Sequence, residues 1–433
     1  MNTLTPQSKP VSVSINQSSN LKRYFQFALL LLAAGAIYPL LYLRQNFETS
    51  ILEAFQITTT DLGNYYSMLG IVYFLAYVPS GWLADKISPR ILIAFSMALT
   101  GGLGLWFASI PSKEVLPYIF IAWGIGAGLT FWASMLKGVK MLARPDEQGR
   151  FFGILDGGRG LVEAVLATIA ISIFAYVVES QGQSNTVALK QIIYMYSFVC
   201  IGLAILTFLF VRTDKLVDDP KDKKSGSGNL FIDLKTLLSI PELWMVAVVI
   251  FCGYQLFWAT YSFSAFMQEG YEITAVTAGF ITVAKLWMRP IGGIGAGFLG
   301  DKYGKENILA IALMGASLGL ISMIAFPNLS SIYLLLAVVL FIGVLTYAIR
   351  GLYWAILDDC NIPLHVTGLA IGIISLIAYT PDIFLPQIYS FIADRYEGMS
   401  VYNLYFGYIA SMGLIGTVAI LKLKKMTAKK KSL

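Results

Sequence analysis

The chain has 433 residues, of which 57% are hydrophobic and only 13% are charged. Soluble domains carry about 25% charged residues, so this composition excludes a soluble globular protein. The formal net charge of +6 lies mostly in connectors and in a basic C-terminal tail, where we expect it to set membrane topology rather than to bind nucleic acid.

Long apolar segments follow one another along almost the whole chain. Each has about 20 residues, enough to cross about 30 Å of hydrocarbon, and the apolar runs are continuous, which favours helices over a barrel. The sequence therefore predicts an all-α membrane protein with twelve transmembrane helices. The expected spans are 24–50, 61–84, 91–110, 116–136, 151–177, 191–212, 240–266, 275–297, 307–326, 331–350, 365–391 and 400–421.

Basic residues gather in alternate connectors between these spans. Twelve spans place both termini on one side, and the connectors on that side are rich in lysine and arginine. The positive-inside rule then predicts a multi-pass protein of the cytoplasmic (inner) membrane with both termini in the cytoplasm. The expected divisions are a disordered cytoplasmic tail (1–22), an N-terminal six-helix bundle (23–212), a cytoplasmic linker (213–236), a C-terminal six-helix bundle (237–422) and a basic cytoplasmic tail (423–433).

One short phrase occurs twice, at Gly81-Trp82-Leu83-Ala84-Asp85-Lys86 and at Gly297-Phe298-Leu299-Gly300-Asp301-Lys302. Asp85 and Asp301 lie 216 residues apart, half the chain length, which indicates two pseudo-symmetric bundles. Both copies resemble the loop motif of the major facilitator superfamily, G-x-L-A-D-[RK]-x-[GP]-[RK]. The resemblance implies two bundles that rock around a central site.

It also implies a gating motif of Gly81, Asp85, Arg90, Gly297 and Asp301. An acid at one helix end can contact a helix N-terminus of the opposite bundle, and the resemblance implies that this contact locks the outward-facing state. The alternative is that these charges only fix topology.

Ionisable residues within the expected spans are costly, so each is a candidate for function. Asp156, Arg159 and Glu163 are spaced i, i+3 and i+7 and share one helical stripe. We predict substrate binding by Arg159 with Asp156 and Glu163 in coupling or charge pairing; a purely structural ladder is the alternative. Glycines beside Arg159 would permit close approach.

Three more ionisable residues lie at membrane depth in the second half. Lys285 and Arg289 have no acid nearby in their own segment, so they need a counter-charge from Glu163, from Asp382 or from a substrate. We predict that both cations bind substrate. Asp382 follows Pro381 and is predicted to couple, gate or pair. Arg350, near a segment end, is expected to snorkel; a role in the site is the alternative.

Arg44 carries a second resemblance. The run Tyr42-Leu43-Arg44-Gln45-Asn46-Phe47 and the loop Asp85-Lys86-Ile87-Ser88-Pro89-Arg90 are similar to the organophosphate:phosphate antiporter branch of the superfamily, which implies that Arg44 binds phosphate. That branch places a second arginine at the symmetry-related position. Here that position, 216 residues on, is Thr260, so Arg159, Lys285 or Arg289 would have to replace it.

We therefore expect a secondary active transporter of a small organic anion, either a phosphorylated, a sulfonated or a carboxylated metabolite, working by alternating access. Phosphate exchange and proton symport both remain open. The alternatives are a proton-coupled transporter of a neutral sugar or drug-like solute and a non-transporting receptor. His365, the only histidine, has no evident nucleophile partner, so we expect no enzyme, and we expect no cofactor, no metal and a monomer in the bilayer.

Overall fold

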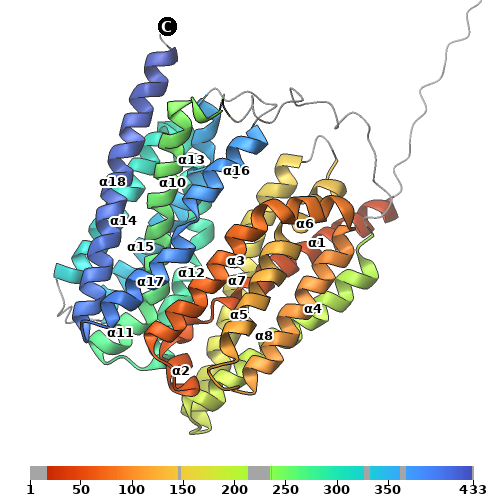
Figure 1. The fold of residues 1–433 in the computed structure, drawn as a ribbon, viewed down its shortest axis with the longest axis vertical. Coiled ribbons are helices and arrows are strands. Elements are labelled where there is room, and N and C mark those ends of the chain that lie inside the picture. Colours follow the sequence, from red (N-terminus) through yellow and green to blue (C-terminus); the bar gives the residue numbers. More distant parts are fainter. Residues whose placement is uncertain are drawn as a thin grey trace, which may run out of the picture.

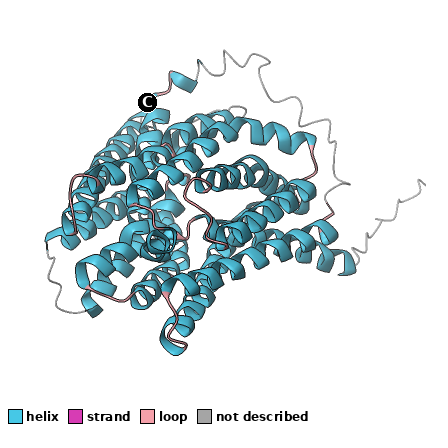
Figure 2. Cartoon of the chain, turned by 60° about the horizontal axis from the view of Figure 1, so that its bottom comes forward, coloured by secondary structure: helices cyan, strands magenta, loops and turns pink. Residues whose placement is uncertain are grey.

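The structure is a computed structural model that describes residues 17–144, 148–212, 235, 237–325, 332–360 and 367–431. Within these ranges every regular element is a helix, and loops join the helices (Figure 2). The expected linker, apart from Lys235, and the connector with His365 lie outside the described residues.

The N-terminal half runs from α1 to α8. Its elements are α1 (Gln17–Leu41), α2 (Arg44–Phe55), α3 (Thr59–Lys86), α4 (Pro89–Ala108), α5 (Leu116–Gly124), the π-helix η1 (Ile125–Phe131), α6 (Trp132–Leu142), α7 (Gln148–Ala175), the π-helix η2 (Tyr176–Ser180) and α8 (Asn185–Phe210).

The C-terminal half runs from α10 to α18. Its elements are α10 (Pro241–Ala259), the 3-10 helix η4 (Thr260–Ser262), α11 (Phe263–Tyr271), α12 (Ala275–Leu286), α13 (Met288–Tyr303), α14 (Lys305–Ala325), α15 (Ile332–Leu352), the 3-10 helix η5 (Ala355–Cys360), α16 (Thr367–Ala378), α17 (Pro381–Ala393) and α18 (Met399–Lys431).

Local sequence explains where several of these helices begin. Thr58 and Asp61 form a capping box before α3, in which each side chain accepts a hydrogen bond from the other residue's backbone N–H. Such caps satisfy amide groups that the first turn leaves open. Proline occupies the first turn of α4, α10 and α17, where its missing N–H costs nothing.

Both halves break their first membrane helix at related places. The first is interrupted between α1 and α2, just before Arg44, and the second turns into η4 at Thr260, which is 216 residues later. Two further breaks, at Trp287 and at Tyr379–Thr380, divide α12 from α13 and α16 from α17. Such breaks free backbone groups inside the protein, where neighbouring side chains can satisfy them.

Ten helical runs among the described residues are long and apolar enough to cross a membrane, and they match ten of the twelve expected spans. The other two expected spans, 61–84 and 275–297, correspond to α3 and α12–α13. α3 has 28 residues, which is long enough to cross a membrane, but the side chains of Tyr77 and Val78 lie outside the described part. α12–α13 carries Lys285 and Arg289, which make it less apolar.

Two expected boundaries differ from the structure at the chain ends. α1 begins at Gln17, so residues 17–22 are helical, although we expected disorder as far as residue 22. α18 continues to Lys431, so most of the expected basic tail extends the last helix.

We call the end of the molecule where α3, α13 and α18 finish the terminus end, and the opposite end, near α2 and α11, the far end. In Figure 1 the two halves lie side by side, approach one another at the bottom near α2, α11 and α17, and separate toward the top, where α18 finishes.

Hydrogen bonds between the halves, among residues whose side chains are described, lie at the far end and at mid-height. At the far end Thr49 Oγ1 donates to Gln268 Oε1 (2.7 Å), Ser264 Oγ to the Asn46 carbonyl (3.0 Å) and Ser67 Oγ to the Ile383 carbonyl (2.8 Å). Thr60–Asp394 and Gln387–Asn64 join the same region. The far end is therefore closed by direct contacts between the halves.

At the terminus end, two lysines hold their own halves together. Lys137 Nζ donates to the Ala84 carbonyl (2.7 Å), and Lys305 Nζ donates to the Ala355 carbonyl (3.2 Å). The two halves are in direct contact at the far end and lie further apart at the terminus end (Figure 1).

Candidate functional site

Charged residues of α7 and α13 meet at mid-height between the two halves. Arg159 contacts Asp156 Oδ1 through Nε (3.0 Å) and Nη2 (2.9 Å). Arg289, from the other half, donates from Nη1 to Glu163 Oε2 (2.8 Å), and its Nη2 lies 3.9 Å from the same Asp156 oxygen. We call these four residues the central charge cluster; it brings together four of the residues that the sequence singled out.

Gly160 makes this meeting of two helices possible. A Cβ atom added to Gly160 would lie 2.4 Å from Arg289 Cδ, closer than any side chain tolerates. The missing side chain lets the stem of Arg289 cross the surface of α7. One step further toward the far end, Trp287 Nε1 donates to Thr168 Oγ1 (3.1 Å).

One side of the central charge cluster is exposed, and the other is buried. The Asp156 side chain is 67% exposed, whereas Arg159 and Arg289 are only 17% and 15% exposed. A carboxylate exposed to hydrocarbon would cost several kcal/mol, so we infer that the exposed face of Asp156 looks into a hydrated opening toward the terminus end.

Lys285 lies apart from the cluster, buried at the break between α10 and η4. Its Nζ donates to Thr260 Oγ1 (3.0 Å) and lies 3.5 Å from the Thr260 carbonyl. Within the described residues, no carboxylate forms an ion pair with it. Thr260 is the position that is symmetry-related to Arg44, so the cation of Lys285 lies beside that position.

Asp382 does not pair with Lys285 or Arg289. It is 6% exposed, and its Oδ1 accepts hydrogen bonds from Tyr254 Oη (2.7 Å) and Trp258 Nε1 (2.7 Å). Two uncharged donors of α10 thus hold this carboxylate at the start of α17, directly after Pro381.

Arg44 is enclosed at the start of α2. Its Nη2 lies 3.1 Å from Glu48 Oε1, and the two side chains are 3% and 1% exposed. The guanidinium lies 5.1 Å from the Tyr66 ring centroid and 5.7 Å from that of Tyr389. Glu48 was not among the residues predicted from the sequence, although its i, i+4 spacing from Arg44 was visible there. The structure gives Arg44 a separate set of neighbours from those of Arg159.

The loop-motif residues lie at the terminus end. Asp301 is exposed at the end of α13, and the Arg90 guanidinium lies 4.7 Å from the Phe208 ring centroid in its own half. A Cβ added to Gly81 or Gly297 would meet open space. Asp85 lies in the last turn of α3, and its side chain is outside the described part.

Arg350 was wrongly assigned to snorkelling. Its guanidinium lies 4.2 Å from the Phe257 ring centroid, so it turns inward to α10 rather than outward to the membrane surface. Tyr254, Tyr261, Tyr353 and Tyr379 are its electrostatic neighbours. The signal in the sequence was an arginine within an apolar run, but its distance from the segment end alone gave no direction for the side chain.

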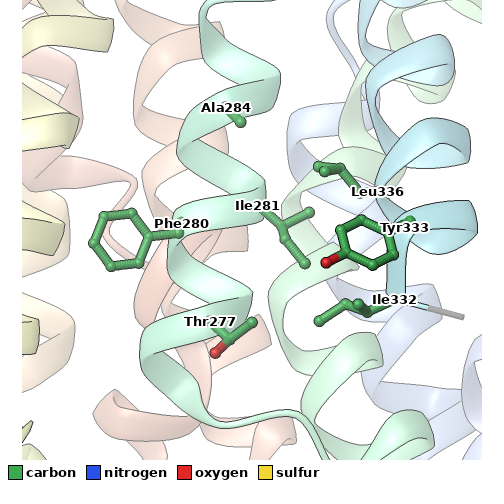
Figure 3. A pocket seen from close by; sticks show the side chains of 7 residues that line it. All are labelled: Thr277, Phe280, Ile281, Ala284, Ile332, Tyr333 and Leu336. Carbon is green, nitrogen blue, oxygen red and sulfur yellow. The ribbon is translucent and has the colours of Figure 1, made fainter.

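A separate apolar groove lies between α12 and α15 (Figure 3). Its lining residues are Thr277, Phe280, Ile281, Ala284, Ile332, Tyr333 and Leu336. The lining carries no charged side chain, so this groove suits hydrocarbon and not an ionic solute.

Comparison with known proteins identifies the class to which this arrangement belongs. The family model of the Major Facilitator Superfamily matches residues 24–386, and the chain therefore belongs to this superfamily of transporters. Among relatives in Escherichia coli K12, the chain is 28% identical to inner membrane protein YqcE (95% of this chain, 97% of the relative) and 26% identical to inner membrane protein YihN (95% and 98%).

Solved structures share the fold. A point mutant of the nucleoside transporter NupG superposes with a TM-score of 0.70 at 12% identity, covering 93% of this chain and 99% of that one. A bacterial homologue of the human lysosomal transporter Spinster, inward-facing and unoccupied, gives 0.64 at 15% identity, covering 93% and 96%. At these identities the likeness establishes the fold and leaves the solute open.

Proposed function

We propose that the protein is a secondary active transporter of a small organic anion, a phosphorylated, sulfonated or carboxylated metabolite, and that it works by alternating access. One observation carries the proposal: Arg159 of the N-terminal half and Arg289 of the C-terminal half converge on a single exposed carboxylate, that of Asp156.

Asp156 has the same chemistry as the anionic group of such a solute. The Asp156 carboxylate is exposed on one side, whereas Arg159 is only 17% exposed, so an incoming anion can approach the pair from the Asp156 side. A carboxylate, sulfonate or phosphate entering from the terminus end can therefore take its place. The forked guanidinium of Arg159 offers an oxyanion two parallel hydrogen bonds.

A site with donors from both halves changes when the halves move, and alternating access requires this of a carrier. The contacts at the far end and the exposed Asp301 suit a state open toward the terminus end. With twelve helices crossing the bilayer and the basic connectors inside, that end faces the cytoplasm, and this conformation is the inward-facing one.

The counter-ion of the proposed transport is phosphate or a proton. The likeness of residues 42–47 to organophosphate:phosphate antiporters supports phosphate. Asp382 supports a proton, because a buried carboxylate held by two neutral donors can exchange a proton without breaking an ion pair. The same observation favours the second candidate, proton-coupled transport of a neutral solute.

Ligand-induced stabilisation of the purified protein tests the choice between the two. A ligand at 100 times its Kd stabilises the folded state by about 2.7 kcal/mol. We expect glucose 6-phosphate, glucuronate or another anion to raise the melting temperature, while glucose does not. Equal stabilisation by glucose and its phosphate would contradict an anionic solute and favour the neutral one.

A further inference from the structure

Arg350 is a cation that the proposed transport mechanism has not yet used. It lies in the last turn of α15, and its guanidinium rests on the Phe257 ring at 4.2 Å. Among the described residues it forms neither a hydrogen bond nor an ion pair, although its guanidinium is not sealed from solvent. An arginine stacked on one face keeps its N–H edge available for a ligand.

Three tyrosine hydroxyls near Arg350 also have no hydrogen-bond partner among the described residues. The rings of Tyr261 in η4 and Tyr347 in α15 lie 5.3 Å and 6.1 Å from that of Phe257, on which Arg350 rests. Tyr38 of α1 lies within electrostatic range of the same guanidinium. None of the three hydroxyls is sealed in the core. A phenol in a mostly apolar setting normally finds a partner.

Aromatic faces surround these hydroxyls and come from both halves. Tyr261 stacks on Tyr42, which follows α1, with centroids 5.4 Å apart, and its ring meets that of Phe257 edge-on at 5.3 Å. Tyr38 also lies within electrostatic range of Arg159, so this group of rings is near the central charge cluster. Rings with unpaired hydroxyls offer apolar faces and hydrogen bonds to one ligand at the same time.

We propose that Arg350, Tyr38, Tyr261 and Tyr347 bind the uncharged body of the solute, and that the solute is a polyhydroxylated cyclic anion of the sugar-acid or sugar-phosphate class. This inference rests on the proposed anion transport and adds the chemistry of the rest of the molecule. The body stacks on the aromatic rings, and its hydroxyl groups pair with the three phenols and the Arg350 edge. An unsubstituted aliphatic or aromatic anion would leave those donors unpaired, and that costs binding energy.

Matched ligands test the inference on the unaltered protein. Binding is measured by thermal shift and calorimetry for glucuronate, galacturonate and glucose 6-phosphate, for their hydroxyl-free counterparts cyclohexanecarboxylate and cyclohexyl phosphate, and for glucose. We expect at least one hydroxylated anion to bind about 10-fold or more tightly than its counterpart, since a site built for hydroxyl groups discriminates strongly against their absence.

Conservative variants test the named residues. Tyr38→Phe, Tyr261→Phe and Tyr347→Phe each remove one oxygen and keep the ring, so each should weaken binding of the hydroxylated anion roughly 3- to 10-fold without affecting its hydroxyl-free counterpart. Tyr118→Phe, at a largely exposed ring, is the matched control and should bind as the unaltered protein does. Arg350→Gln should weaken binding by about 10-fold or more.

The possible failures are distinguishable. If no hydroxylated anion binds more tightly than its counterpart, or if the three Tyr→Phe variants bind like Tyr118→Phe, the inference about the body is overturned while anion transport stands. If glucose binds as tightly as the anions, the proposed function fails, and this inference fails with it.

Discussion

Arg44 and Arg159 each contact an acid of their own helix, yet water reaches the two pairs very differently. Arg44–Glu48 is almost fully enclosed, with exposed fractions of 3% and 1%, whereas Arg159–Asp156 has 17% and 67%. An enclosed pair is costly to break, and an exposed pair exchanges its partner readily. From this difference in burial we propose that Arg44 holds α2 in place in this conformation and that Arg159 is the arginine open to a ligand.

Removing one partner of the enclosed pair tests that assignment. Arg44→Met leaves Glu48 buried without a counter-charge and should destabilise the protein by about 3–5 kcal/mol. The double variant Arg44→Met with Glu48→Leu should recover most of this loss, because both charges are gone. Melting curves of the purified variants measure both. Equal stability of the single and double variants would contradict the structural role.

For Asp156, the exposed acid, we expect that removing the charge leaves stability almost unchanged and strengthens ligand binding. Asp156→Asn removes the carboxylate that occupies Arg159 and Arg289, so an anionic ligand should bind more tightly, by up to about fivefold, with little change in melting temperature. Glu114→Gln, at an exposed loop acid, is the control. Weaker anion binding in Asp156→Asn, measured by calorimetry, would show that Asp156 does not compete with the ligand.

At the level of helices, α3 and α17 make the most extensive contact between the two halves. A Cβ added to Gly70 would lie 2.5 Å from the carbonyl oxygen of Asp382, so the two backbones touch there. Ser67 Oγ donates to the Ile383 carbonyl one turn away. Because backbone atoms cannot turn aside as a side chain can, this contact depends on glycine at position 70.

Gly70→Ala should therefore push α17 away and shift the protein toward a state with an open far end. Spin labels at the exposed residues Gln56 and Glu397 would report a longer distance across that end. Gly102→Ala, where an added Cβ meets open space, should leave the distance unchanged. Identical distance distributions in the two variants would contradict the close-contact account.

The helices and their charges were predictable from the sequence to different degrees. The repeat at Asp85 and Asp301 and the i, i+3, i+7 stripe on α7 predicted the two halves and one side of the charge cluster, since both follow from spacing alone. The sequence left the partner of Arg289 open among Glu163, Asp382 and a substrate, because the contact with Glu163 depends on how two distant helices pack. The inward turn of Arg350 and the enclosure of Arg44 depend on the breaks in the helices, and spacing carries no information about those.

For the whole molecule, the two ends are expected to open in alternation. The far end is closed by contacts such as Thr49–Gln268, and Asp301 at the terminus end is exposed. We expect Asp85 and Asp301 to lock the state in which the far end is open. In that state, Asp301→Asn and Asp85→Asn should each lengthen the distance between spin labels at Arg212 and Tyr303. Unchanged distributions in both variants would remove the gating role of the repeated motif.

Solute uptake by proteoliposomes tests the central claim most directly. Radiolabelled glucose 6-phosphate, glucuronate and glucose are compared at equal concentration, with and without phosphate inside the vesicles, for the unaltered protein, Arg159→Gln and the control Glu114→Gln. We predict uptake of an anion several times faster than that of glucose, its loss in Arg159→Gln, and its retention in Glu114→Gln. Equal uptake of the anions and glucose, or full activity of Arg159→Gln, would contradict an anion carrier built around the central charge cluster.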